Sequence, residues 1–169
     1  MHVLDTQQIN ELINILEQEA RVYEAVFKLS KNKTSVIVEG KVSELENMVK
    51  LEQSLVIQIG RLENLRESVA GALAEKLGMK NTELTLSELA KHLKGEQGNK
   101  LTEVQSRISG TLDELKGSNE LNSRLIKNSL DFINFSINMI ASVDTGTNNY
   151  GLNGQVNDTK KRNFFDMKL

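Results

Sequence analysis

The sequence predicts an all-α fold: an antiparallel bundle of three long coiled-coil-like helices, with one short helix and a flexible C-terminal tail. Its 169 residues contain no proline, the residue that most often interrupts helices. Apolar residues recur at steps of three and four over long stretches, a spacing that places them on one helix face. The composition is 38% hydrophobic and 4% aromatic, which suits narrow helix–helix seams better than a thick core.

The first two long helices are expected at about residues 6–38 and 43–77. The first has apolar residues at helical spacing, and Gly40 follows it as a residue suited to a helix end. The second begins at Ser43-x-x-Glu46, a pattern typical of a capping box, and Gly78 follows its last turn. Its seam, taken in alternate steps of three and four, is mostly apolar with polar interruptions, as in a coiled coil.

A short helix is expected at about 85–93 and a third long helix at about 100–143. The short helix starts at a second capping box, Thr85-x-x-Glu88, and Gly95 and Gly98 follow it. Residues 1–144 are therefore expected to form the bundle. Residues 145–169 show no periodicity and predict a flexible tail. The tail contains Phe164 and Phe165 after a polar linker, which suggests a docking element but is equally compatible with a terminus of no function.

Charge and residue content argue against several classes of function. The net charge is −2 with both signs interspersed, whereas nucleic-acid binding needs a concentrated basic face. There is no cysteine, no secretory signal and no run of about 20 apolar residues, so we expect a cytoplasmic protein without membrane insertion. The two histidines lie far apart in sequence, and no Glu-x-x-His or phosphate-binding glycine pattern occurs. We therefore expect no enzyme activity, no cofactor and no metal.

The stretch 125–143 has more apolar residues than one seam needs. One stripe contains Ile126, Leu130, Ile133, Ile137 and Ile140, and a second face contains Phe132, Phe135 and Met139. Its only charged residues are Lys127 and Asp131. A helix that is apolar on two faces is either buried all round or offers a face to a partner. Core, binding groove and dimer interface all remain open on this evidence.

Four asparagines accompany the third long helix. A buried asparagine in a helical seam fixes register at a cost in stability, and Asn119 and Asn122 interrupt the seam in this way. Asn128 and Asn134 are also compatible with a solvent-exposed face.

The order of these motifs resembles the FlgN family of flagellar export chaperones. Lys33-x3-Ile37-x2-Gly40, with the later Glu52, Leu62-Glu63 and Arg66, is similar to the family's first half. The segment Thr85–Leu89 is similar to its short central helix, and Asn119-Glu120-Leu121-Asn122-x2-Leu125-Ile126 to its asparagine-rich motif. The tail, with Tyr150-Gly151 and a Phe-Phe-Asp ending, resembles Gram-positive members.

The resemblance implies a cytoplasmic chaperone that binds hook–filament junction (hook-associated) proteins and delivers them to the flagellar type III export apparatus, without a nucleotide. In the family the C-terminal helical region holds the client, which transfers here to Leu125, Ile126, Leu130, Phe132, Ile133, Ile137 and Ile140. Such a chaperone is expected to be a monomer or a weak homodimer. The alternative is a self-associating coiled-coil scaffold with no transient client, which predicts an obligate or high-order oligomer through 125–143.

Overall fold

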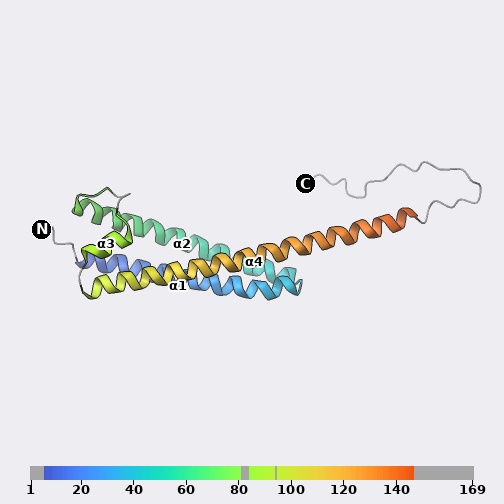
Figure 1. The fold of residues 1–169 in the computed structure, drawn as a ribbon, viewed down its shortest axis with the longest axis horizontal. Coiled ribbons are helices and arrows are strands. Elements are labelled where there is room, and N and C mark those ends of the chain that lie inside the picture. The colour runs from blue at the N-terminus through green and yellow to red at the C-terminus, as the bar shows by residue number, and fades with distance from the viewer. Residues whose placement is uncertain (1–5, 81–83, 94, 147–169) are drawn as a thin grey trace, which may run out of the picture. The chain divides into compact units, whose positions relative to one another are not determined.

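The computed structural model describes residues 6–80, 84–93 and 95–146, and the side-chain surroundings as far as residue 143. These ranges contain four helices and no strand: α1 (Thr6–Val38), α2 (Val42–Leu77), α3 (Leu86–His92) and α4 (Glu96–Gly146) (Figure 1). The prediction of an all-α bundle is confirmed. The predicted tail, apart from residues 145–146 at the end of α4, lies outside the described residues.

Glycines end the first two helices through the same backbone geometry. Gly40 has φ 67°, and the amides of Gly40 and Lys41 donate to the carbonyls of Ile37 and Val36, each at 3.1 Å. Gly78 has φ 68°, and it and the next amide bond back to the last turn of α2 in the same pattern. A left-handed residue that satisfies the last carbonyls is how helices commonly stop, and glycine adopts it without strain.

The two predicted capping boxes have different outcomes. Thr85 is the N-cap of α3, and its hydroxyl accepts a hydrogen bond from the Glu88 amide at 3.1 Å. The Ser43 prediction is wrong, because α2 begins at Val42 and its N-cap, Lys41, makes no side-chain capping bond. The tight turn at Gly40 brings Lys41 directly to the helix start, so Ser43 already lies inside the first turn.

The chain divides into two units, Met1–Ile126 and Lys127–Leu169. In the first unit, α2 and α4 both pack on α1. Lys33 and Tyr23 of α1 bond Glu52 and Glu63 of α2, so the pairing runs antiparallel. The pairs between α1 and α4 advance together along both helices, from Glu17–Arg107 to Thr34–Asn122, so these two helices run parallel (Figure 1).

The interior of the first unit changes character along its length. At the end that holds α3, an apolar cluster joins all four helices; it contains Ile9, Leu12, Leu16, Leu73, Leu89, Leu101 and Val104 among its buried members. A smaller cluster of Ile15, Val22 and Leu62 continues it. Toward the other end the α1–α4 contact becomes polar, centred on Ser30 and Asn122. The apolar core therefore holds the four helices together mainly at one end.

Candidate protein-binding surface

The C-terminal part of α4 exposes large apolar side chains. Eight of them lie between residues 130 and 143, with exposed fractions from 39% to 70%: Leu130, Phe132, Ile133, Phe135, Ile137, Met139, Ile140 and Val143. Scattered apolar residues are normal on a protein surface, whereas a continuous patch of this kind makes the segment a candidate binding surface.

These side chains occupy two neighbouring faces of the helix. Leu130, Ile133, Ile137 and Ile140 follow one another at steps of three and four and share a stripe. Phe132, Phe135, Met139 and Val143 follow the same spacing on the adjacent face. The surface is therefore wider than the single seam of a two-helix contact.

Two serine hydroxyls within this surface are already hydrogen-bonded to carbonyl groups of their own helix. The Ser136 hydroxyl donates to the Phe132 carbonyl at 2.9 Å, and the Ser142 hydroxyl donates to the Met139 carbonyl at 2.7 Å. A hydroxyl bonded to its own helix needs no polar partner from outside. The charged side chains of the segment are Lys127 and Asp131, so an apolar partner would have few charges to desolvate.

The structure distributes the seven residues of the sequence-predicted site over both units. Leu125 and Ile126 lie at the end of the first unit; Leu125 is half-buried and Ile126 is 39% exposed. Leu130, Phe132, Ile133, Ile137 and Ile140 lie in the second unit and are all exposed. Phe164 and Phe165, the residues of the predicted tail-docking element, lie outside the described residues.

The asparagines of α4 differ in their surroundings. Asn122 is buried; its amide nitrogen donates to the Ser30 carbonyl at 2.8 Å, and its Oδ1 accepts from the Thr34 hydroxyl at 2.7 Å. The Asn119 Oδ1 accepts from the Ser30 hydroxyl at 2.8 Å. Asn128 and Asn134 are exposed. Asn119 is also exposed, so Asn122 is the asparagine of α4 whose burial meets the condition for fixing register.

Ion pairs reinforce the α1–α4 contact. Arg107 of α4 contacts Glu24 through Nε at 2.5 Å and Glu17 through Nη1 at 3.0 Å. The hydrogen bond from Arg107 lowers the pKa of Glu24, because it favours the charged carboxylate. Each partner is more than a third exposed, so solvent screening makes the contribution of this network to stability modest.

Sequence reasoning missed a groove in the first unit, between α2 and α4. Its cavity of about 590 Å³ has α1 residues at its base, among them Tyr23, Val26 and Ile37. The α2 wall consists of Leu45, Val49, Glu52, Val56 and Ile59, and the α4 wall of Leu115, Asn119, Asn122, Ser123 and Ile126. The signal that could have revealed it is the apolar spacing of Leu45, Val49, Val56 and Ile59 at steps of three, four and seven along α2.

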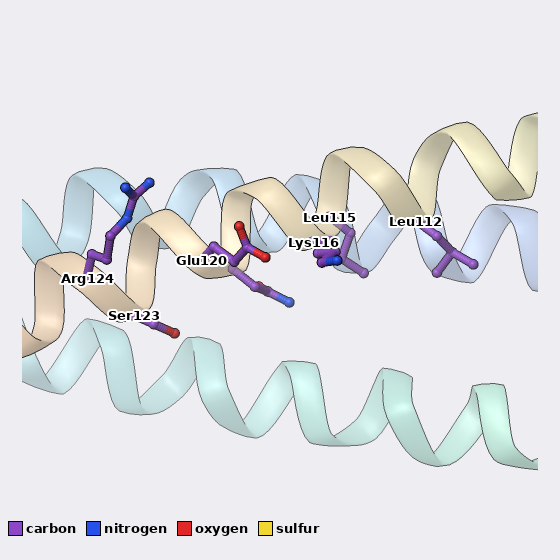
Figure 2. A pocket seen from close by; sticks show the side chains of 7 residues that line it. Leu112, Leu115, Lys116, Glu120, Ser123 and Arg124 are labelled. Carbon is purple, nitrogen blue, oxygen red and sulfur yellow. The ribbon is translucent and has the colours of Figure 1, made fainter.

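The groove continues over α4 into a shallower hollow. Its lining shares Leu115, Asn119 and Ser123 with the groove and adds Leu112, Lys116, Glu120 and Arg124. Figure 2 shows these side chains along α4, with Ser123 pointing toward α2. Lys116, Glu120 and Arg124 form no ion pair with any residue that the structure describes, whereas the charges between α1 and its neighbours are paired.

Among the helices of the described residues there is no candidate for a membrane-spanning segment. Across residues 6–80, 84–93 and 95–146, histidine, aspartate and glutamate side chains nowhere gather in a group of three that could hold a metal ion.

The chain is an all-α bundle with a large exposed apolar surface on its last helix, and comparison with known proteins gives its family. The family model described as "FlgN protein" matches residues 1–158. The chain therefore belongs to the FlgN family. It is similar to YvyG of Bacillus subtilis (strain 168), at 28% identity over 158 residues, covering 91% of this chain and 96% of that protein. No solved structure matches the chain. The FlgN family is a chaperone family, and membership supports a flagellar chaperone-type role.

Proposed function

We propose that this chain is a non-catalytic cytoplasmic chaperone that binds hook-associated flagellar proteins and delivers them to the flagellar export apparatus. The observation that carries the proposal is the exposed two-faced apolar surface of α4 between residues 130 and 143. Hook-associated proteins are the clients that the family resemblance implies, and family membership supports a flagellar role in general.

The proposed binding mode is helix against helix. A client terminus that forms a coiled coil in the assembled flagellum exposes its own apolar stripe when it is free. Leu130, Ile133 and Ile137 repeat at the spacing by which one helix covers another, and Ile140 continues the stripe. With both stripes covered, neither the client nor the chaperone presents them to water.

The free energy gained by burying one face of the segment can be compared with the cost of association, and the comparison favours binding through both faces. Full burial of one such side chain contributes about 1.5–3 kcal/mol, so a half-exposed stripe residue contributes roughly 1 kcal/mol from each partner. The four stripe residues would then supply about 8 kcal/mol together with the client, against an association cost of roughly 4–15 kcal/mol. The second face, with Phe132, Phe135 and Met139, supplies the additional burial that a stable complex needs.

The identity of the client is tested by affinity purification from the native cell, followed by mass spectrometry. Recovery of hook-associated proteins that bind again as purified components supports the proposal. Recovery of the bait alone, with the chain in an obligate or high-order oligomer, supports the self-associating scaffold instead.

The contribution of the C-terminal tail is a separate question. Phe164 and Phe165 are proposed to add contacts to the bound client, because they are apolar residues after a polar linker. Deletion of residues 157–169 is then expected to weaken client binding. Unchanged affinity of the truncated chain, measured by calorimetry with the purified client, would show that the tail is dispensable.

A further inference from the structure

The first half of α2 presents exposed apolar side chains to the groove between α2 and α4. Val49 and Val56 line that groove and are 38% and 55% exposed. The buried residues of α2, Leu62, Leu73 and Ala74, all lie in its second half. Apolar side chains that line a groove and remain exposed are typical of a surface that a partner covers.

The groove face of α4 continues, along the same helix, into the exposed apolar stripe. Four residues of the groove wall follow one another at steps of three and four: Leu115, Asn119, Asn122 and Ile126. The stripe begins one turn later and keeps this spacing: Leu130, Ile133, Ile137 and Ile140. From Leu115 to Ile140, seven steps span 25 residues, or about 3.6 residues per step, which is the repeat of an α-helix. The two sets of residues therefore share one face of α4.

The lengths of the two surfaces define the length of helix that would cover them. The α2 wall from Leu45 to Ile59 measures about 21 Å at 1.5 Å per residue, which is about four turns. The α4 face from Leu115 to Ile140 measures about 38 Å by the same rise. One continuous amphipathic helix of about 25 residues would cover the groove and the stripe, whereas a helix of half that length would cover only one of them.

Polar side chains of the α4 wall distinguish the groove from the apolar stripe. Asn119 Oδ1 accepts a hydrogen bond from the Ser30 hydroxyl at 2.8 Å. The amide nitrogen of Asn119 and the hydroxyl of Ser123, which points toward α2 (Figure 2), form no hydrogen bond with any residue that the structure describes. A donor that is buried without an acceptor costs free energy. A helix bound in the groove is therefore expected to carry a polar side chain at this level.

The charges in and beside the groove favour a helix with a particular charge pattern. Lys33 and Glu52 line the groove, and their ion pair of 2.7 Å neutralises both. On the rim, Lys116, Glu120 and Arg124 alternate in sign at steps of four and have no ion-pair partner among the described residues. A helix with acidic, basic and acidic side chains at the same spacing complements this rim in either chain direction, because the pattern reads the same both ways.

We propose that the α2–α4 groove is a second contact site for the client, whose amphipathic helix lies on the exposed stripe of α4 and continues into the groove. The inference rests on the proposed function and deepens it, because it states the length and chemistry of the recognised helix. The stripe accepts apolar side chains of many kinds. The polar wall and charged rim of the groove reject helices without matching groups, so the groove gives the chaperone its selectivity among apolar helices.

The first test measures client affinity by calorimetry with a purified hook-associated protein. Val56→Asp introduces a charge into the groove wall, and Ile57→Asp is its matched control, since Ile57 is 59% exposed but does not line the groove. Val56→Asp is expected to weaken binding about tenfold or more, as at a core interface position, and Ile57→Asp to keep the affinity within about twofold. Both variants are expected to retain the native circular dichroism, because both positions are exposed.

Equal affinities of Val56→Asp and Ile57→Asp for the client would overturn the proposal. The proposed function would survive that result as long as Ile133→Asp abolishes binding, because the stripe would then bind the client without the groove. A native chain that binds no hook-associated protein would contradict the proposed function, and the inference that rests on it would fall as well.

The second test does not depend on the stability of a charged variant. The sequence contains no cysteine, so an introduced thiol is the only one in the chain. Val56→Cys, Ile57→Cys and Ile133→Cys are each treated with a small maleimide, with and without the purified client, and the labelled fraction of the chain is measured by mass spectrometry. The client is expected to slow labelling several-fold in Val56→Cys and Ile133→Cys and to leave Ile57→Cys unchanged.

The pattern of protection separates the inference from the proposed function. Protection in Ile133→Cys alone would show that the client stays outside the groove, so the inference would fall while the proposed function stands. Equal protection in Val56→Cys and Ile57→Cys would also contradict docking in the groove. Protection in none of the three variants would contradict the proposed function itself.

Discussion

At the residue scale, Glu19 shows how burial and pairing compete in this bundle. Its side chain is almost fully buried between α1 and α2, and its Oε1 accepts a hydrogen bond from Arg66 Nε at 3.0 Å. Desolvation raises the pKa of Glu19, and the hydrogen bond and charge of Arg66 oppose that rise without cancelling it. The charged carboxylate is therefore less favourable in the folded state than in the unfolded chain.

This raised pKa determines the sign of a pH effect. A carboxyl whose folded pKa lies above its unfolded value stabilises the fold at low pH and loses that contribution as pH rises through the folded pKa. Glu19→Gln removes the titration. The free energy of unfolding of the variant minus that of the native chain is therefore expected to increase from pH 4 to pH 7, as measured by urea denaturation. The opposite trend would mean that Arg66 outweighs desolvation.

Asn122 gives a second prediction at this scale. Asn122→Ala leaves the Ser30 carbonyl and the Thr34 hydroxyl without their partner in a buried contact. The free energy of unfolding is expected to fall by about 1–3 kcal/mol. Asn128→Ala, at an exposed position on the same helix, is the control and is expected to change it by less than about 0.5 kcal/mol. Equal effects would show that the α1–α4 polar contact is not formed.

At the element scale, Gly98 and Gly110 of α4 distinguish the effect of helix propensity on stability from the effect of side-chain packing. Alanine in place of a helix-interior glycine usually stabilises by about 0.5–1 kcal/mol. A Cβ at Gly110 would meet nothing within 4 Å, whereas one at Gly98 would lie 3.0 Å from the Leu93 carbonyl oxygen. Gly110→Ala is therefore expected to raise the melting temperature and Gly98→Ala to lower it, or to leave it unchanged at most. A stabilising Gly98→Ala would show that the turn between α3 and α4 relaxes easily.

Much of each element could be predicted from the sequence, because a helix seam is a local pattern. The long helices follow from apolar spacing, and Gly40 and Gly78 mark ends that depend on neighbouring residues only. The start of α2 could not be predicted in this way: Ser43 matches a capping pattern, but the backbone turn at Gly40 decides where the helix begins. The exposure of Val49 and Val56 depends on how α2 and α4 both pack on α1, which is a tertiary property.

At the scale of the whole molecule, the distribution of apolar residues explains why the chain has surfaces left for partners. The first unit gathers its fully buried apolar residues near α3 and uses Ser30 and Asn122 toward the other end of α1. The second unit has apolar residues on two helix faces and buries none of the large ones between 130 and 143. The sequence indicated that this stretch has more apolar residues than a single helix–helix seam needs. It could not indicate whether those residues lie in the core or on the surface, because burial depends on which helices lie nearby.

Client binding at the exposed apolar surface of α4 is measured by calorimetry with a purified hook-associated protein. Ile133→Asp is compared with Asn134→Asp, its exposed neighbour on the same helix. Ile133→Asp is expected to abolish measurable binding and Asn134→Asp to keep the affinity within a few-fold of native, and both variants are expected to retain the native helical circular dichroism. Native affinity in Ile133→Asp, or unfolding of that variant alone, would show that this surface does not bind the client.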